Sequence, residues 1–319
     1  MKIQSHSHKP EPYFFGEDEY HLGLELEVEA PDERAKDAGL NISQQPRYCY
    51  AKHDGTLNEG VGWELVTHPI SRALWMDKTA KRSCVSSFFD LIKGLRGLGY
   101  TSHAGSRCGL HIHIGYSAFR GAVTHHLVYA RMRNGDLVCN RSSVTKIVPR
   151  RPHLYWFARL INSQLFRQIS QRDKNSLETW AALCPVATRD FHRLGRARRY
   201  MATNFTDKTL EVRIFRGNMR EERIRKCIES VVAGVEFTRQ ITYRTRLSEL
   251  TAAFESYVVD HRATYPNLYN YLVEINVLTA SVEAPKKAGN VAKDRAKIDG
   301  ARLERRRKEK LKKGTKACV

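Results

Sequence analysis

The sequence lacks paired cysteines, long apolar runs and the glycine-rich loops that hold nucleotide phosphates. Its seven cysteines lie far apart and none forms a C-x-x-C pair, which argues against a disulfide framework and a structural zinc site. No stretch approaches the roughly 18 consecutive apolar residues of a membrane span, and residues 1–15 contain no apolar signal core. We therefore expect a soluble, cytoplasmic protein without membrane contact. Because neither common phosphate loop occurs, a bound nucleotide would need another kind of site.

The positive charge of the chain is concentrated at its end. The 319 residues carry a net charge of +20, and residues 286–319 hold fourteen Lys or Arg against four Asp or Glu, half of that excess. We expect a flexible arm over residues 1–19, one folded domain over residues 20–280, and a basic, disordered tail over residues 281–319. The tail is compatible with a solvated segment or with contact to RNA, DNA or another polyanion.

The hydrophobic pattern changes between the two-residue period of strands and the period of helices. Strands are predicted at 20–29, 49–52, 63–67, 108–116, 200–205 and 209–215. Helical spacing is predicted over 71–98, most clearly from 81 onward, and helices over 154–169, 221–243 and 247–278, with 119–180 mostly helical, whereas 31–48 is predicted to be a loop. Strands come early and late with helices between them. This order indicates an α+β fold with an antiparallel or mixed sheet.

The most informative strand alternates leucine or valine with glutamate over residues 23–29. Glu25, Glu27 and Glu29 share one face of it, and neighbouring carboxylates on such a face lie about 6.5–7 Å apart. Acids in a row repel one another unless a cation lies between them, and oxygen ligands of this kind suit Mg²⁺. Taken alone, the row is explained equally well by a solvated strand face.

Two further acids and a pair of histidines could join this row. Glu64 lies on the strand at 63–67 and Asp54 in an Asp-Gly turn, positions that surface and turn residues also occupy. His111 and His113 share one face of the strand at 108–116, with Gly115 next on that face. Two such imidazoles can bind a metal, transfer protons or contact a phosphate, or they can simply be solvated.

The last group of polar residues follows residue 198. Glu211 and Arg213 share a strand face, Arg216 lies just past the expected strand end, and Arg199 and Asn204 precede them. An acid beside arginines is compatible with an ordinary cross-strand salt bridge, which contributes little. Alternatively, the acid holds a metal while the guanidinium groups bind phosphate oxygens in pairs.

In their order along the chain, these motifs resemble those of the amidoligase family of ATP-dependent carboxylate–amine ligases. The resemblance covers residues 20–240 and implies a glutamine synthetase-like fold, a curved and mainly antiparallel sheet whose concave face binds ATP and two or more Mg²⁺ ions. It also implies that the domain 20–280 forms an amide or isopeptide bond. The matching segments are Gly23-Leu24-Glu25-Leu26-Glu27, His53-Asp54-Gly55-Thr56-Leu57, Trp63-Glu64-Leu65-Val66-Thr67-His68-Pro69, Gly109-Leu110-His111-Ile112-His113, Arg199-Tyr200 with Asn204, and Glu211-Val212-Arg213-Ile214-Phe215-Arg216-Gly217.

The resemblance also assigns roles to the acids. Glu25, Glu27 and Glu211 are expected to bind metal, and Glu64 to be a ligand of the metal or a residue on the substrate side. Asn204 is a weaker candidate for contact with substrate or phosphate.

The basic residues are expected to contact the nucleotide. The resemblance places His111 or His113 against the nucleotide phosphates or the metal. Arg213 and Arg216 are expected to neutralise the transferred phosphoryl group, and Arg199 is a weaker candidate for the same kind of contact.

The implied reaction activates a carboxylate by phosphoryl transfer and then adds an amine to the acyl phosphate. Asp54 or Glu64 could accept the proton of the incoming ammonium group. Because an acyl phosphate hydrolyses in water, we expect a lid, for which residues 30–48 and 100–107 are candidates.

Two other classes of protein remain open. His-x-His with several acids also suits a metal-dependent hydrolase that activates water at Zn²⁺ or Mn²⁺ and ignores ATP. The basic tail also suits a nucleic-acid-binding protein. The amine and carboxylate substrates, whether amino acid, peptide, cell-wall fragment or protein side chain, and the oligomeric state are not specified by the sequence.

Overall fold

A computed structural model describes most of the chain. The chain divides into two units, Met1–Leu278 and Thr279–Val319, and all the elements below belong to the first. The described residues are 3–8, 10–43, 46–58, 60–79, 81, 83–102, 107–119, 129–131, 137–139, 151–183, 200–241 and 247–279.

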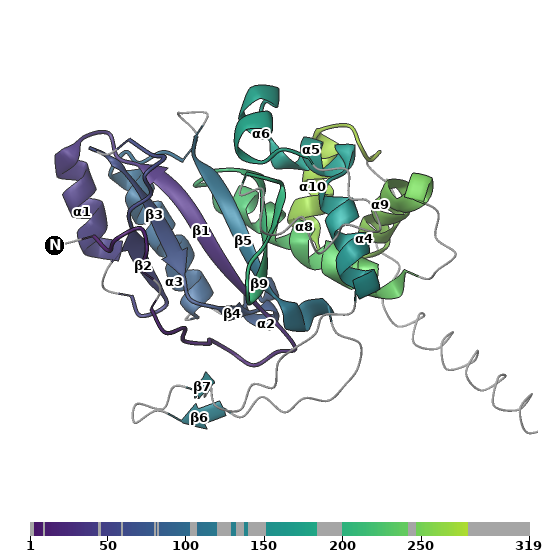
Figure 1. The fold of residues 1–319 in the computed structure, drawn as a ribbon, viewed down its shortest axis with the longest axis horizontal. Helices are drawn as coiled ribbons and strands as arrows, with labels where there is room; N and C mark the ends of the chain where they lie inside the picture. Colours follow the sequence, from purple (N-terminus) through teal and green to yellow (C-terminus); the bar gives the residue numbers. More distant parts are fainter. Residues whose placement is uncertain are drawn as a thin grey trace, which may run out of the picture. The chain divides into compact units, whose positions relative to one another are not determined.

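A seven-stranded sheet forms the centre of this unit, in the order β2-β3-β1-β5-β9-β8, with β4 also paired to β1 (Figure 1). All of these strand pairs are antiparallel, which confirms the predicted α+β class. The strands are β1 (His21–Glu29), β2 (Cys49–Lys52), β3 (Gly62–Thr67), β4 (Ile70–Ser71), β5 (Gly109–Gly115), β8 (Thr203–Phe205) and β9 (Thr209–Arg216).

One face of the sheet is apolar and packs into the core. Leu24, Leu26 and Ile112 are completely buried there, together with apolar residues of the helices α3 (Cys84–Gly97) and α8 (Glu221–Gln240). Helix α3 begins with a capping box in which Ser83 and Ser86 satisfy each other's backbone N–H groups. Because successive strand residues point to opposite faces, burying the leucines turns the alternating glutamates to the other face.

A group of helices from residues 151–274 gathers beyond β9, around α8 (Figure 1). Helices α4 and α10 contact α8, and α5 contacts β9. The helices of this group are α4 (Arg151–Ile161), α5 (Gln164–Ser170), α6 (Lys174–Trp180), α9 (Leu250–Asp260) and α10 (Pro266–Glu274). No helix among the described residues combines the length and apolar character needed to cross a membrane.

A helix replaces most of the loop predicted at residues 31–48. This helix is α1 (Glu33–Ser43), so the loop prediction was wrong for these residues, while the lid expected at residues 30–48 stays a prediction. Asp32 begins the helix, because its carboxylate accepts a hydrogen bond from Ala35 N at 2.7 Å. The helix has little apolar character, so its periodic signal was weak. Of the other lid candidate, residues 103–106 lie outside the described residues.

The predicted helical region 119–180 also needs correction. It contains a second sheet of two short strands, β6 (Tyr129–Arg131) and β7 (Leu137–Cys139). The expected helix at 154–169 is divided into α4 and α5, because Ser163 caps the N-terminus of α5. Likewise, 247–278 divides into a 3₁₀ turn (Leu247–Glu249), α9 and α10, and the last of these begins at Pro266. The helical stretch expected at 71–98 divides into α2 (Arg72–Met76) and α3, and two shorter elements went unpredicted, β4 and a 3₁₀ turn (Tyr116–Phe119).

The N-terminal segment runs along the edge of the sheet beside β2. Gln4 N donates to Ala51 O, and His53 N donates to Gln4 O. Further on, Phe15 N donates to Pro69 O at 2.9 Å. The two hydrogen bonds of Gln4 cover part of the β2 edge, which would otherwise present unpaired groups, whereas the Phe15 hydrogen bond lies beside β4.

Candidate functional site

The acids, histidines and Arg213 predicted on separate strands meet on the polar face of the sheet. Strand register brings them together: Glu27 pairs with Glu64, Glu25 with His111, and His113 with Glu211. Glu27, Glu64, His111 and Glu211 are each at least 96% buried, which is unusual for charged groups on a sheet face. Seven side chains from four strands therefore form one continuous polar centre.

The first cluster in this centre consists of Glu25, His113 and Glu211. One ligand atom from each lies within 4.8 Å of the others. His113 Nε2 is 3.4 Å from Glu25 Oε1 and 4.0 Å from Glu211 Oε1, and it is buried without a hydrogen-bond partner among the described residues. His113 Nδ1 forms a hydrogen bond with Thr209 Oγ1 at 3.1 Å, which orients the ring. Two carboxylates and an imidazole nitrogen held in this way form a donor set for a divalent cation.

His111 lies between this cluster and the next. Its Nδ1 is 3.5 Å from Glu25 Oε2 and 3.4 Å from Glu211 Oε1, while Nε2 is 3.9 Å from Glu27 Oε1. The Nδ1 atom is buried and has no hydrogen-bond partner among the described residues. His111 therefore contacts acids of both clusters with one ring.

The second cluster consists of Glu27, Asp54 and Glu64, whose ligand oxygens also lie within 4.8 Å of one another. Gly109 N donates to Glu27 Oε2, and Thr56 donates to Asp54 Oδ1 through its backbone N–H and its hydroxyl, at 2.7 and 2.8 Å. The Asp-Gly turn thus directs Asp54 at Glu27 and Glu64. The acids of the two clusters are called the acid row below; they are Glu25, Glu27, Asp54, Glu64 and Glu211. Three carboxyl groups so close together need a proton or a cation to offset their repulsion.

Lys52 supplies one such cation, and the sequence reasoning missed it. It ends β2 opposite Glu64, and its Nζ lies 2.8 Å from Glu64 Oε2 and 3.8 Å from Glu25 Oε1. The alternation along β2 places Lys52 on the face opposite the buried Ala51, which was a usable signal. Its contact with Glu64, however, follows only from the β2–β3 register.

Arg213 and Asn204 hold Glu211 from the β8–β9 side. Arg213 Nη1 donates to Glu211 Oε1 at 2.6 Å, and Asn204 Nδ2 donates to Oε2 at 2.8 Å. Arg213 Nε is buried and has no hydrogen-bond partner among the described residues. A salt bridge is therefore present in this motif, but it lies within β9 and not across two strands, and binding of metal by Glu211 and of phosphate by Arg213 stays a prediction.

A β-bulge separates Arg213 from Arg216. Leu110 pairs with Phe215 whereas Ile112 pairs with Val212, so two β9 residues lie opposite one residue of β5. Arg216 then pairs with Gly109 as the last residue of β9, not beyond the strand end, and it is exposed. Its expected phosphate contact stays a prediction. Arg199 lies outside the described residues.

Arg172 is a second residue that sequence reasoning missed. It lies between α5 and α6 and is only 7% exposed. A Cβ added to Gly109 would collide with Arg172 Nη2, and it would lie 3.1 Å from His111 Nε2 and 3.3 Å from Glu27 Oε2. The guanidinium therefore reaches the acid row over a residue without a side chain. Arg172 lies far along the sequence from every other site residue, so no sequence pattern indicated that it joins the site.

Without a bound cation, the electrostatic environment of the first cluster favours the ionised form of its acids and the charged form of its imidazole. Burial favours neutral Glu25, but the charge of His113, contact with His111 and the Lys52 ammonium hold the pKa of Glu25 well below its usual range. Burial also opposes ionisation of Glu211, yet His113, His111 and Arg213 lower its pKa. Burial works against charge on His113 too, but Glu25 and Glu211 raise its pKa.

The second cluster holds its proton on Glu64. Burial, the charge of Glu25 and the hydrogen bond with Asp54 raise the pKa of Glu64 to about 9. Burial works against ionised Asp54, but hydrogen bonds from Glu64 and Thr56 lower its pKa. Burial raises the pKa of Glu27, although the charge of His111 opposes this. Neighbouring carboxyl groups whose pKa values are shifted in opposite directions are typical of functional sites.

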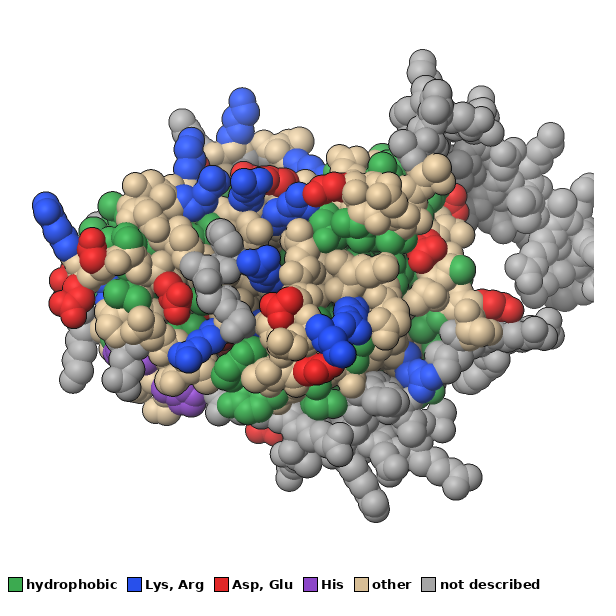
Figure 2. Space-filling view, turned by 90° about the horizontal axis from the view of Figure 1, so that it is seen from above, with side chains coloured by type: hydrophobic (Ala, Val, Ile, Leu, Met, Phe, Trp, Pro, Cys, Tyr) green, Lys and Arg blue, Asp and Glu red, His purple; other side chains and the backbone are tan. Residues whose placement is uncertain are grey.

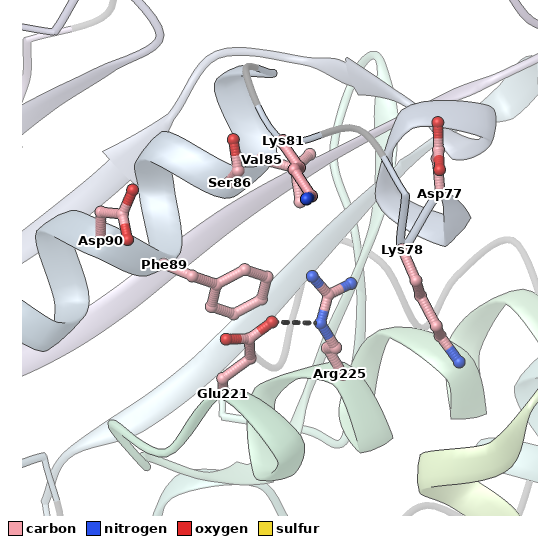
Figure 3. Close-up of a pocket in the computed structure, with 9 residues that line it drawn as sticks. All are labelled: Asp77, Lys78, Lys81, Val85, Ser86, Phe89, Asp90, Glu221 and Arg225. Atoms are coloured by element: carbon pink, nitrogen blue, oxygen red, sulfur yellow. Dashed lines mark hydrogen bonds and ion pairs between the residues drawn. The ribbon is translucent and has the colours of Figure 1, made fainter.

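A separate pocket of about 220 Å³ lies between α3, α8 and the segment after α2 (Figure 3). In it, Arg225 donates to Glu221 at 2.7 Å and lies over the ring of Phe89 at 4.4 Å. None of its lining residues belongs to the acid row. Across the face shown in Figure 2, Lys and Arg are interspersed with Asp and Glu, which differs from the single-sign surface of a nucleic-acid-binding protein.

The antiparallel sheet and its two acid clusters define a class of site suited to divalent cations and anionic substrates. A family model described as "Putative amidoligase enzyme" matches residues 34–234, more than half of the chain, and the chain belongs to that family. The matched region contains both histidines, Glu64, Glu211 and Arg213 but begins after β1, so Glu25 and Glu27 join the site through the structure alone. No curated protein matches the chain.

Proposed function

We propose that this protein is an ATP- and Mg²⁺-dependent ligase that joins a carboxylate to an amine through an acyl phosphate. The observation that carries the proposal is the convergence of two carboxylate clusters and Arg213 on one polar sheet face. Membership of the amidoligase family supports ligase chemistry. A glutamine synthetase-like curvature of the sheet belongs to the same proposal, with the substrates on the polar face.

The residues present fit divalent cations. Carboxylate oxygens are hard ligands of the kind Mg²⁺ takes, and the buried His113 Nε2 lacks a hydrogen-bond partner among the described residues, as a ligand atom would. Glu25, His113 and Glu211 would hold one ion, and Glu27, Asp54 and Glu64 a second. When bound, Mg²⁺ offsets the negative charge of a nucleoside triphosphate.

The protein's own groups then serve the two steps. In the first, a carboxylate oxygen of the substrate bonds to the γ-phosphorus of ATP while the bond to the β–γ bridging oxygen breaks and ADP leaves. The guanidinium of Arg213, held by Glu211 at 2.6 Å, would stabilise charge on the phosphoryl oxygens. His111, between the clusters, would contact the same oxygens.

In the second step, the amine bonds to the acyl carbon and phosphate leaves. The incoming ammonium group must first lose a proton, and we assign this proton to Asp54, which hydrogen bonds from Glu64 and Thr56 keep ionised although burial opposes its charge. Glu64, the other acid that the sequence suggests for this role, has a pKa of about 9 and would first have to lose its own proton. The deep burial of the acid row limits access of water to the acyl phosphate.

An ADP-release assay tests this proposal. The full chain would be incubated with ATP, Mg²⁺ and pooled carboxylates and amines, beside the double variant Glu25→Ala/Glu27→Ala. Glu29→Ala is the matched control, because Glu29 lies on the same strand but outside both clusters. We expect substrate-dependent ADP release that the double variant loses and the control keeps. Substrate turnover without ATP, on Zn²⁺ or Mn²⁺, would instead support the metal-dependent hydrolase.

The other sequence predictions keep their place beside this proposal. The amine and carboxylate could be carried by an amino acid, a peptide or a protein side chain, and the location is predicted to be cytoplasmic. Contact between the basic segment 281–319 and a polyanion is tested by deleting residues 286–319. Ligase activity should survive this deletion, while salt-sensitive polyanion binding should disappear.

A further inference from the structure

Arg172 is a buried cation that reaches the acid row from the helical group. Its Nε donates to Phe215 O on β9 at 3.2 Å, and its Nη1 donates to Ser176 Oγ at 3.0 Å. These two hydrogen bonds fix the plane of the guanidinium. Nη2 is left as the nitrogen that approaches Gly109, beside Glu27.

The loop that carries Arg172 is held in place by another buried cation. Lys226 of α8, 1% exposed, donates through Nζ to Ile169 O at 2.6 Å and to Gln171 Oε1 at 3.3 Å, and it lies 4.4 Å from the ring centre of Tyr271. Gln171 itself adopts a left-handed backbone with φ of 61°. A buried lysine and a left-handed non-glycine residue are both unfavourable in isolation. The structure therefore maintains this loop conformation against local preference.

The Arg172 guanidinium occupies the space that Gly109 leaves because it has no side chain. Gly109 is the residue of β5 over which the guanidinium lies, and any Cβ there would displace it. Arg213 already donates to Glu211, whereas Arg172 Nη2 has no hydrogen-bond partner among the described residues. A guanidinium edge without a partner, beside a carboxylate cluster that can hold a cation, can bind an anion that is bound together with that cation.

We propose that Arg172 binds the phosphate group handled at this site, donating through Nη2 to a phosphoryl oxygen next to the Glu27–Asp54–Glu64 cluster. The inference rests on the proposed function in one respect, which is that the phosphate belongs to a nucleoside triphosphate. Arg172 would thus act beside Arg213, because it bonds to the backbone of the strand that carries Arg213.

Measuring the binding of an anion and of a cation to the full chain distinguishes phosphate binding by Arg172 from a purely structural role. Binding of Mn²⁺-tripolyphosphate would be measured by titration calorimetry, and binding of Mn²⁺ alone by electron paramagnetic resonance, for Arg172→Met and Gly109→Ala. Gly109→Ala keeps the charge but displaces the guanidinium. The control is Arg223→Met, because Arg223 pairs with Glu274 and, like Lys226, lies over the ring of Tyr271, so the variant removes a cation next to the loop support and leaves Arg172 in place. Thermal midpoints of all variants would be recorded.

We expect Arg172→Met to weaken tripolyphosphate binding by about tenfold to a hundredfold, the range of a hydrogen bond to a charged group. Its affinity for Mn²⁺ alone should stay the same or increase, because a positive charge beside Glu27 is removed. Gly109→Ala should weaken tripolyphosphate binding as well, and Arg223→Met should not.

Three results would overturn the inference: wild-type protein that does not bind tripolyphosphate, variants that bind it normally, or a parallel loss of Mn²⁺ affinity. Tripolyphosphate binding that depends on Arg172, without ADP release from ATP in any substrate pool, would sink the proposed ligase function and leave this inference standing.

Discussion

Lys52 Nζ lies 2.8 Å from Glu64 Oε2, between the ends of two neighbouring strands and inside the candidate metal centre. Both side chains are largely buried, at 14% and 6% exposed. The ammonium group also lies 3.8 Å from Glu25, so one lysine offsets charge in both carboxylate clusters. A fixed cation at this point lets the acid row fold before any metal binds.

Replacing Lys52 by a neutral residue should destabilise the metal-free protein more than the protein in the presence of Mg²⁺. We expect Lys52→Met to lower the free energy of unfolding by about 2–4 kcal/mol in EDTA, because buried carboxylates lose their partner. The loss should be smaller in Mg²⁺, which can take over the neutralising charge. Urea unfolding of Lys52→Met and the charge-conserving Lys52→Arg, with and without metal, measures this. Equal losses in EDTA and Mg²⁺ would show that no divalent cation binds beside Lys52.

The pH dependence of stability should report the proton held by Glu64. Its folded pKa of about 9 exceeds the value of about 4.3 in an unfolded chain, so the folded state binds more protons between these values. Its contribution to stability is therefore fully present below about pH 4.3 and is lost as the pH rises through about 9. Glu25 acts in the opposite sense at acid pH, because its lowered pKa gives stability that is lost as pH falls.

The variant Glu64→Gln isolates this effect. In EDTA, the free energy of unfolding of the wild type should decrease more steeply between pH 5 and pH 9 than that of Glu64→Gln. Urea titrations at a series of pH values provide the comparison. Parallel curves for the two proteins would mean that Glu64 titrates normally, and that the clusters are more solvated than the structure shows.

Substitution of Arg213 should lower the free energy of unfolding far more than substitution of Arg216, although the two lie three residues apart. Truncating Arg213 leaves Glu211 buried without its 2.6 Å partner, so Arg213→Met should cost about 3–5 kcal/mol of unfolding free energy. Arg216 is exposed, and Arg216→Met should change stability by no more than about 0.5 kcal/mol. If Arg216 binds phosphate as the sequence predicts, its variant should lose ATP affinity at unchanged stability. Similar thermal shifts for both variants would contradict these placements.

The sequence predicts the polar face of the site because strand alternation is a local property. The alternating acids of Glu25–Glu29 and the pair His111 and His113 could be placed on faces from two-residue spacing alone. Which strands neighbour which could not be derived in this way. The resemblance to the amidoligase family supplied the expectation that Glu64 and Glu211 would lie on the same face, and the strand registers confirm it.

The parts that sequence reasoning missed depend on tertiary structure. Lys52 joins the site through the β2–β3 register, and Arg172 through a loop fixed by Lys226 from a helix 50 residues later. Helix α1 was taken for a loop because its sequence is polar and its cap at Asp32 is a single hydrogen bond. No sequence pattern predicts the β-bulge between β5 and β9. Arg216 was therefore expected beyond the strand end, whereas it is the last residue of β9.

Formation of a hydroxamate tests the central claim most directly, because hydroxylamine can replace the unknown amine and trap an acyl phosphate. The full chain would be incubated with pooled carboxylates, hydroxylamine, ATP and Mg²⁺, beside Glu25→Ala/Glu27→Ala and Glu29→Ala. The ligase hypothesis predicts hydroxamate and ADP in equal amounts, dependent on ATP and Mg²⁺, lost in the double variant and kept in Glu29→Ala. Hydroxamate formed without ATP, or formed equally by the double variant, would contradict it.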